Sequence, residues 1–165
     1  MWILEVVFLA VFWTWVGCAI LLWRLSLIRG DARPSSSGGL AWDPVSLRAS
    51  DGYPLSAWRL RAPDADSSWV ILCEGPERSG QRLAEAAAAL QGSGLSVLWL
   101  GFRNQSPAHR WRMSSLGWRE QRDLEGALVW LGRQAEIPAR PYGVYGRAMG
   151  AGAALLVAAR DERIG

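Results

Sequence analysis

The chain opens on an uninterrupted apolar segment and then changes to a regular alternation of apolar and polar stretches. Residues 2–23 carry a single charge, Glu5. As a helix this segment would be about 33 Å long, enough to cross a hydrocarbon core of about 30 Å. Trp2 and Trp23 stand at its two ends, where indole rings favour the membrane interface. The pattern predicts one transmembrane anchor within residues 1–28.

A buried core helix and a cleaved signal peptide are the alternatives for this segment. Core helices rarely run this long without polar residues, and a signal peptide would have a basic side chain before the apolar run. Residues 15–18 resemble a lipoprotein cleavage box, but apolar residues continue to Trp23. We therefore expect an uncleaved single-pass anchor. Three arginines follow it between positions 24 and 33, so the positive-inside tendency places the remainder in the cytoplasm.

Residues 29–43 are rich in glycine, serine and proline, which predicts a linker. Residues 44–165 then form one domain. Alternation of apolar and polar side chains at 45–50 predicts a half-buried strand. Asp51 and Gly52 form a turn signal, and residues 55–60 are expected to pair back as the second strand of a hairpin.

Strands and helices alternate in the rest of the domain. The strands are expected at 69–73, 96–100 and 142–145, and the helices at 81–90, at 118–134 and from a glycine-rich turn through Arg160. On the helix at 118–134, Arg119 is one turn from Asp123 and can pair with it. This order of elements predicts an α/β fold in which an antiparallel hairpin precedes a mainly parallel sheet.

Composition excludes several kinds of chemistry. All 18 basic residues are arginine, and without lysine there is no Walker-A loop, Schiff-base nucleophile or kinase-type ATP lysine. One histidine and two distant cysteines exclude a Cys/His zinc site, so we expect no metal and no cofactor. The net charge is only +3 and the arginines are scattered, which argues against nucleic acid as a partner.

The glycine-rich turn carries the most specific signal. Gly146, Arg147, Ala148, Met149 and Gly150 lie between a predicted strand and a predicted helix. This is the position of the nucleophile elbow, G-x-S-x-G, where a sharp turn exposes a serine. Around this turn, residues 45–165 resemble the α/β-hydrolase family, in particular membrane-anchored bacterial members related to serine aminopeptidases and acylglycerol lipases.

Matches outside the turn support the resemblance. They are Asp51 and Gly52 in the hairpin, Gly75 after the first buried strand, Arg103 after the next strand, and Gly117, Glu120 and Asp123 at the following helix. The resemblance implies a partial α/β-hydrolase-like sheet, with 44–165 as its N-terminal portion. It also implies that an active member would use a serine, a histidine and an acid.

The departures from the family fall on the chemistry. The elbow holds Ala148 in place of serine, and Glu74-Gly75 stands where the family has His-Gly beside the oxyanion hole. An ionised Glu74 there would oppose a developing oxyanion. The family's D-x-R-G-x-G run keeps only its arginine, at residues 101–106. The family's acid and histidine come after the elbow, yet the 15 residues after Gly150 contain no histidine. We therefore expect no catalytic residue in this chain.

Two other kinds of site, a cysteine–histidine dyad and an arginine anion site, each have a simpler alternative explanation. A Cys73–His109 dyad is less favoured than a buried apolar cysteine and a solvated histidine. Arg103 and Arg147 both follow strand ends, and Arg147 adjoins a helix start, so together they could bind an anion. Two unrelated surface arginines are the better-favoured explanation in a chain so rich in arginine.

Three hypotheses for function follow. The leading one is a membrane-anchored α/β-hydrolase-like protein that is catalytically inactive, as a pseudoenzyme or a fragment. The second is the front portion of a genuine membrane-anchored serine hydrolase of the esterase, lipase or peptidase kind, and the intact mass of the endogenous product separates these two. The third is an interaction module in which a protein partner covers the open edge of the strand at 142–145.

Overall fold

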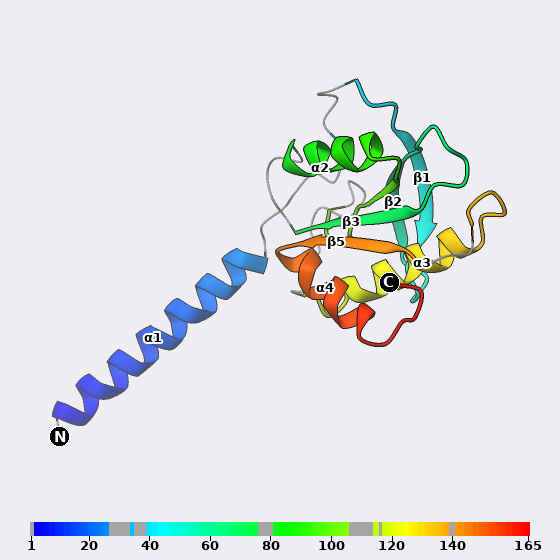
Figure 1. Cartoon of the computed structure of the whole chain (residues 1–165). Coiled ribbons are helices and arrows are strands. Elements are labelled where there is room, and N and C mark those ends of the chain that lie inside the picture. Colours follow the sequence, from blue (N-terminus) through cyan, green and yellow to red (C-terminus); the bar gives the residue numbers. More distant parts are fainter. Residues whose placement is uncertain are drawn as a thin grey trace.

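The computed structural model describes residues 2–26, 34, 39–75, 81–105, 114–115, 117–138 and 141–165. They form an N-terminal helix and an α/β domain (Figure 1). The helices are α1 (Trp2–Ser26), α2 (Gln81–Gly92), α3 (Glu120–Gly132) and α4 (Met149–Ala158), and the strands are β1 (Asp43–Arg48), β2 (Pro54–Leu60), β3 (Trp69–Glu74), β4 (Ser96–Leu100) and β5 (Gly143–Arg147).

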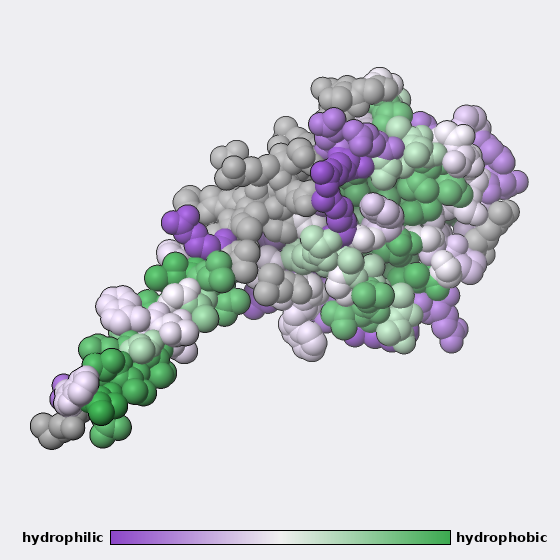
Figure 2. Space-filling view, turned by 60° about the vertical axis from the view of Figure 1, so that its left-hand side comes forward, coloured by the Kyte–Doolittle hydropathy of each residue, from purple (hydrophilic) through white to green (hydrophobic). Residues whose placement is uncertain are grey.

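Helix α1 is long and apolar enough to cross a membrane. Its hydrophobic stretch, Trp2–Arg24, has a mean hydropathy of 2.3, and none of that window is buried within the structure. Figure 2 shows hydrophobic residues along nearly the whole helix. A signal sequence shares this length and composition, so the structure supports a membrane-compatible helix and leaves its topology as a prediction.

The five strands form one sheet in the order β1-β2-β4-β3-β5. β1 pairs antiparallel with β2 through the predicted hairpin, and β2 pairs antiparallel with β4. β3 lies parallel between β4 and β5. The predicted α/β architecture is confirmed, with the hairpin joined to the parallel strands through β2.

Helices cover both faces of the sheet, α2 on one face and α3 with α4 on the other (Figure 1). Both faces of β3 are buried because helices cover both sides of the sheet, which explains its continuous apolar sequence. Four apolar residues of α3 form one stripe that is fully buried in the core beneath that helix: Leu124, Ala127, Leu128 and Leu131.

Two local expectations were wrong. Helix α3 begins at Glu120 and ends at Gly132, and so is shorter at both ends than the predicted 118–134. Arg119 does not take Asp123 as its partner, because the Asp123 carboxylate is turned into the domain and accepts hydrogen bonds from Arg103. Because the Asp123 carboxylate is buried, its partner is Arg103 from the loop after β4 and not Arg119, its neighbour on the helix.

β5 ends the sheet, as the sequence predicted. One isolated parallel bridge, between Tyr142 and Ile164, lies on its outer side. The Tyr142 N–H donates to the Arg163 carbonyl (2.6 Å), and the Gly165 N–H donates to the Tyr142 carbonyl (3.3 Å).

Candidate functional site: an elbow without a nucleophile

The turn from β5 into α4 has the strained backbone of a nucleophile elbow. Ala148 has φ 49° and ψ −121°, and it is the one non-glycine residue with positive φ among the described residues. Such a conformation costs on the order of 1–3 kcal/mol and persists where the surroundings enforce it. The elbow geometry is thus present, with a methyl group at the position from which a serine hydroxyl would project.

Two glycines enforce this geometry by permitting close backbone approach. A Cβ on Gly146 would lie 2.7 Å from the Ala151 Cα, and a Cβ on Gly150 would collide with the carbonyl oxygen of Cys73. Any side chain at these positions would push α4 away from β3 and β5. The sequence pattern G-x-x-x-G therefore marks a packing requirement that holds whatever residue occupies the apex.

Gly75 faces the apex of the elbow from the end of β3. A Cβ there would lie 3.1 Å from both the Ala148 Cβ and the Met149 nitrogen. In this fold an oxyanion hole uses the N–H after the nucleophile, here that of Met149, together with an N–H from the loop after β3. The Gly75 N–H instead donates to the Arg147 carbonyl at 3.2 Å.

An ion pair occupies the same edge of the sheet. Arg147 Nη1 lies 3.4 Å from Glu74 Oε1, and the Glu74 side chain is 6% exposed against 28% for Arg147. The carboxylate is therefore held beside Gly75, as the sequence placed it, and the guanidinium compensates its charge. The positive charge of Arg147 is therefore used within the protein, on the carboxylate of Glu74.

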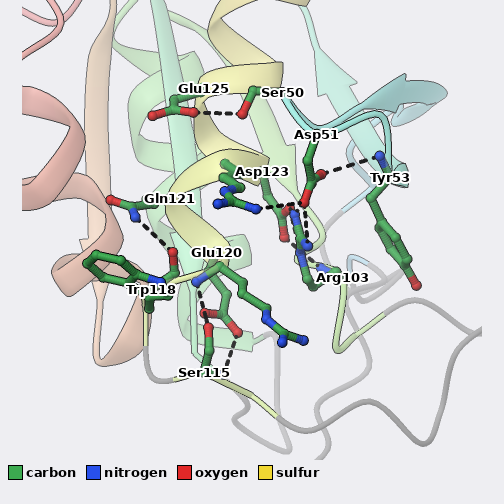
Figure 3. A network of polar contacts seen from close by, with 12 residues as sticks. Ser50, Asp51, Tyr53, Arg103, Ser115, Trp118, Glu120, Gln121, Asp123 and Glu125 are labelled. Atoms are coloured by element: carbon green, nitrogen blue, oxygen red, sulfur yellow. Dashed lines mark hydrogen bonds and ion pairs between the residues drawn. The ribbon is translucent and has the colours of Figure 1, made fainter.

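Arg103 is likewise engaged with carboxylates of the protein. Its guanidinium donates to Asp123 Oδ1 through Nε (2.9 Å) and Nη2 (2.6 Å), and to the two Asp51 oxygens at 2.9 and 3.1 Å (Figure 3). The guanidinium carbon also lies 5.1 Å from the centre of the Tyr53 ring. Arg103 therefore joins the β1–β2 turn to α3, and an anion site shared by Arg103 and Arg147 stays a prediction.

The charges of this cluster shift the pKa values of its members. Burial raises the pKa of Asp123 to about 6, although hydrogen bonds from Arg103 oppose the shift. The Arg103 hydrogen bond holds the pKa of Asp51 below its usual range. Burial lowers the pKa of Arg103, but its bonds to the two aspartates outweigh burial and leave it raised. The cluster therefore keeps its cation at every accessible pH.

Glu120 organises the segment before α3. Its fully buried carboxylate accepts bonds from the Ser115 N–H (3.0 Å) and hydroxyl (2.5 Å) and from the Gly117 N–H (3.0 Å). Burial raises its pKa, but these hydrogen bonds outweigh burial and hold it below the usual value. The family-matching residues Asp51, Arg103, Gly117, Glu120 and Asp123 are therefore a scaffold for the fold.

Sequence reasoning missed the role of Gln105. Its side-chain amide donates to the carbonyl oxygens of Glu74 and Gly75, both at 3.3 Å, and its oxygen accepts the Phe102 N–H at 3.0 Å. The neighbouring Asn104 is buried, and neither side-chain amide atom has a partner within the described part of the chain. The only signal was the loss of the family's glycines at 101–106.

Only the cysteine of the Cys73–His109 pair lies within the described residues. Cys73 is fully buried, and burial raises the pKa of its thiol far above the usual value, so the nucleophilic thiolate is disfavoured. His109 lies outside the described residues. Within the described ranges no group of three or more His, Cys, Asp or Glu side chains could hold a metal ion.

Comparisons with known proteins agree on the fold. No family model matches the chain. The uncharacterised protein Rv2307c of Mycobacterium tuberculosis is 31% identical over 124 residues, which cover 74% of this chain and 43% of that protein. The esterase Pf2001 of Pyrococcus furiosus superposes with a TM-score of 0.63 at 24% identity, covering 76% of this chain and 50% of the esterase.

A second solved structure, the esterase domain of a Rhodothermus marinus protein, gives a TM-score of 0.58 at 21% identity over 76% of this chain and 48% of that one. The chain therefore spans about half the length of the relatives it matches. The resemblance to serine aminopeptidases and acylglycerol lipases in particular stays a prediction. With the elbow, the sheet order and these neighbours together, the chain has the α/β-hydrolase fold.

Proposed function

We propose that this chain is a membrane-anchored α/β-hydrolase-fold protein that is catalytically inactive. The observation that carries the proposal is Ala148, which keeps the elbow conformation but has no hydroxyl to attack a carbonyl.

The surroundings of the elbow are also unsuited to an acyl-transfer transition state. An oxyanion needs converging N–H donors in a site free of negative charge, and losing one donor alone costs on the order of 10²–10³ in rate. Here the Gly75 N–H is bonded to Arg147, and the Glu74 carboxylate belongs to the residue before it. Restoring the hydroxyl would therefore leave catalysis incomplete.

Membrane anchoring by α1 is the second part of the proposal. A helix of 25 residues with one acidic residue in its first turn is long enough to span a bilayer. Arg24 follows its apolar stretch, which favours a cytoplasmic domain and makes the lipid bilayer the first partner of this chain. Retention in the membrane pellet after alkaline carbonate extraction tests the anchor, and protease access in sealed vesicles of known orientation tests the topology.

Activity-based labelling tests the inactivity. The full chain in mild detergent is incubated with a fluorophosphonate probe and with short-chain p-nitrophenyl esters, beside its Ala148→Ser and Ala148→Gly variants. We expect no labelling and no hydrolysis above the detergent blank in all three. Ester hydrolysis by the unmodified chain that disappears on changing Cys73 or His109 would overturn the proposal, since it would reveal a different nucleophile.

The alternative is that the chain is the front portion of a genuine membrane-anchored serine hydrolase. It is supported by the esterases among the structural neighbours and by the half-length coverage of the relatives. The endogenous product decides between them through its intact mass and its labelling by the same probe. A product well above 18.1 kDa that reacts with the probe would favour the alternative.

A further inference from the structure

The outer side of α3 combines an exposed tryptophan with arginines. α3 packs against β1, at the end of the sheet away from β5, and Gly126 lets the helix approach the carbonyl of Arg48. Its apolar stripe is buried beneath it, so the opposite side of the helix faces solvent. Residues spaced by three or four positions follow that side from the turn before α3 to its end, and we call them the α3 outer face: Trp118, Arg122, Glu125, Val129 and Arg133.

Trp118 is exposed and yet firmly held. Its side chain is 67% exposed, whereas the other described tryptophans of the domain are buried or half-buried. The Trp118 N–H donates to the Ser115 carbonyl at 3.3 Å, and its carbonyl accepts the Gln121 side-chain amide at 2.8 Å. Figure 3 shows the indole ring projecting from the start of α3, away from Arg103. Indole rings favour the headgroup region of a membrane, so a rigidly held, exposed indole indicates a contact surface.

The arginines of the α3 outer face are only partly neutralised by carboxylates. Arg133 is exposed, and so is Arg119 beside the face; neither side chain has an ion pair with a described residue. Arg122 is 51% exposed and lies 3.6 Å from Asp51, which is already paired with Arg103 at 2.9 Å. These guanidinium groups are therefore available to a partner with negative charge.

Glu125, the one acidic residue of the α3 outer face, is itself neutralised. Its Oε1 lies 2.5 Å from Nη2 of Arg160, whose side chain is 51% exposed, and its Oε2 accepts the Ser50 hydroxyl at 2.7 Å. The face is therefore basic over about 22 Å of helix, from Trp118 to Arg133. A basic surface with an exposed indole is complementary to anionic phosphates that have an apolar layer beneath them.

We propose that the α3 outer face docks on the anionic lipid surface of the membrane that holds α1. Its guanidinium groups donate paired hydrogen bonds to lipid phosphates, and the Trp118 indole enters the headgroup region. The chain between Ser26 and Asp43 extends to at most about 55 Å, so α1 keeps the domain close to that surface and the local concentration of lipid is high. Docking therefore rests on the proposed anchoring, whereas the charge and exposure of the face do not.

Spin-label accessibility in lipid nanodiscs tests the docking on the full chain. In a Cys18→Ala background, in which Cys73 stays buried, Trp118→Cys carries a nitroxide label, which is apolar and stands where the indole stood. Ser93→Cys, exposed directly after α2, is the matched control. The nanodiscs contain phosphatidylcholine alone or equal parts of phosphatidylcholine and phosphatidylglycerol. In the anionic mixture the label at position 118 is expected to become less accessible to a water-soluble nickel complex and more accessible to oxygen. A label at 118 that responds no more than the label at 93 overturns the proposal.

Removing one arginine tests the charge. Each arginine near an anionic surface strengthens the attraction about fivefold, so Arg133→Gln in the labelled chain is expected to lower the ratio of docked to free domain by that factor. Arg82→Gln is the matched control, because Arg82 is also exposed but lies on α2, and it should leave the ratio unchanged. Equal effects of the two variants overturn the proposal. So does a label that stays exposed in both lipid mixtures, which is the result expected if the partner were a protein. Release of the chain on carbonate extraction refutes the anchoring, whereas a retained chain that does not dock refutes the docking alone.

Discussion

Arg103 provides the most direct test of what joins the β1–β2 turn to α3. Arg103→Met removes four side-chain hydrogen bonds, two to Asp123 and two to Asp51. Asp123 is fully buried, so the variant leaves a carboxylate without its cation. Breaking a buried pair from one side costs about 3–5 kcal/mol, out of a total of about 5–15 kcal/mol for a domain. We therefore expect the free energy of unfolding to fall by about 3–5 kcal/mol.

The assay is urea unfolding of the full chain in dodecyl maltoside, followed by tryptophan fluorescence, which includes the buried Trp69 and Trp99. Arg122→Met is the matched control. Arg122 also approaches Asp51, at 3.6 Å, but its side chain is 51% exposed, so its removal should change the free energy of unfolding by less than about 1 kcal/mol. Equal effects of the two variants would refute the assigned role of Arg103.

The ion pair of Arg103 with Asp123 also predicts that substitutions at the two positions are not additive, and that the stability lost in Arg103→Met depends on pH. Adding Asp123→Asn to Arg103→Met removes the stranded charge, so the double variant should be about 1–3 kcal/mol more stable than additivity predicts. The pKa of Asp123 is already raised to about 6, and losing the cation raises it further. Protonation is thus easier in the variant, and its deficit should be smaller at pH 5 than at pH 8. An additive double variant, or a deficit that grows as pH falls, would contradict this.

Three further outcomes are expected in the same assay. Ala148→Gly should leave stability unchanged or raise it by up to about 1 kcal/mol, because relief of the positive φ exceeds the added chain entropy; a loss above 1 kcal/mol would contradict the strain. Gly150→Ala should destabilise by about 3 kcal/mol or more, since its methyl meets the Cys73 carbonyl; the usual helix gain would contradict the packing. Glu120→Gln should lower the free energy of unfolding by about 1–3 kcal/mol above pH 4.5, and this loss should shrink as the pH falls through the lowered pKa of Glu120. A loss that does not change with pH would show that it arises from packing and not from the charge.

The fold was predictable from the sequence because its strands are distinct in pattern. β3 and β4 are continuous apolar runs, β1 alternates, and each is bounded by a turn signal, so their number and order follow from local sequence. Figure 1 confirms the helices that were expected between and after them. The boundaries of α3 were less predictable, because the preceding turn is fixed by the buried Glu120 and not by local propensity.

The site was predictable in its backbone and less so in its partners. The spacing of Gly146 and Gly150 located the elbow, because only glycine at these positions lets α4 approach β3 and β5 so closely. The pairing of Arg103 with Asp51 was not predictable, because the two residues are 52 positions apart in sequence. Several other carboxylates could equally have balanced the charge of Arg103. The partners of Gln105 were not predictable, since its side-chain amide binds carbonyl oxygens, which every residue carries.

The elbow of this chain keeps the strained backbone of a nucleophile turn although the residue at its apex has no hydroxyl. The positive φ at Ala148 is enforced by the close packing at Gly146 and Gly150, which does not depend on a hydroxyl at the apex. Replacing the apical serine of such a turn by alanine therefore removes the reaction without relaxing the backbone. A folded domain can keep a strained turn whichever residue stands at its apex, because relaxing the backbone at an alanine would require α4 to move away from β3 and β5 and would open the core beneath it.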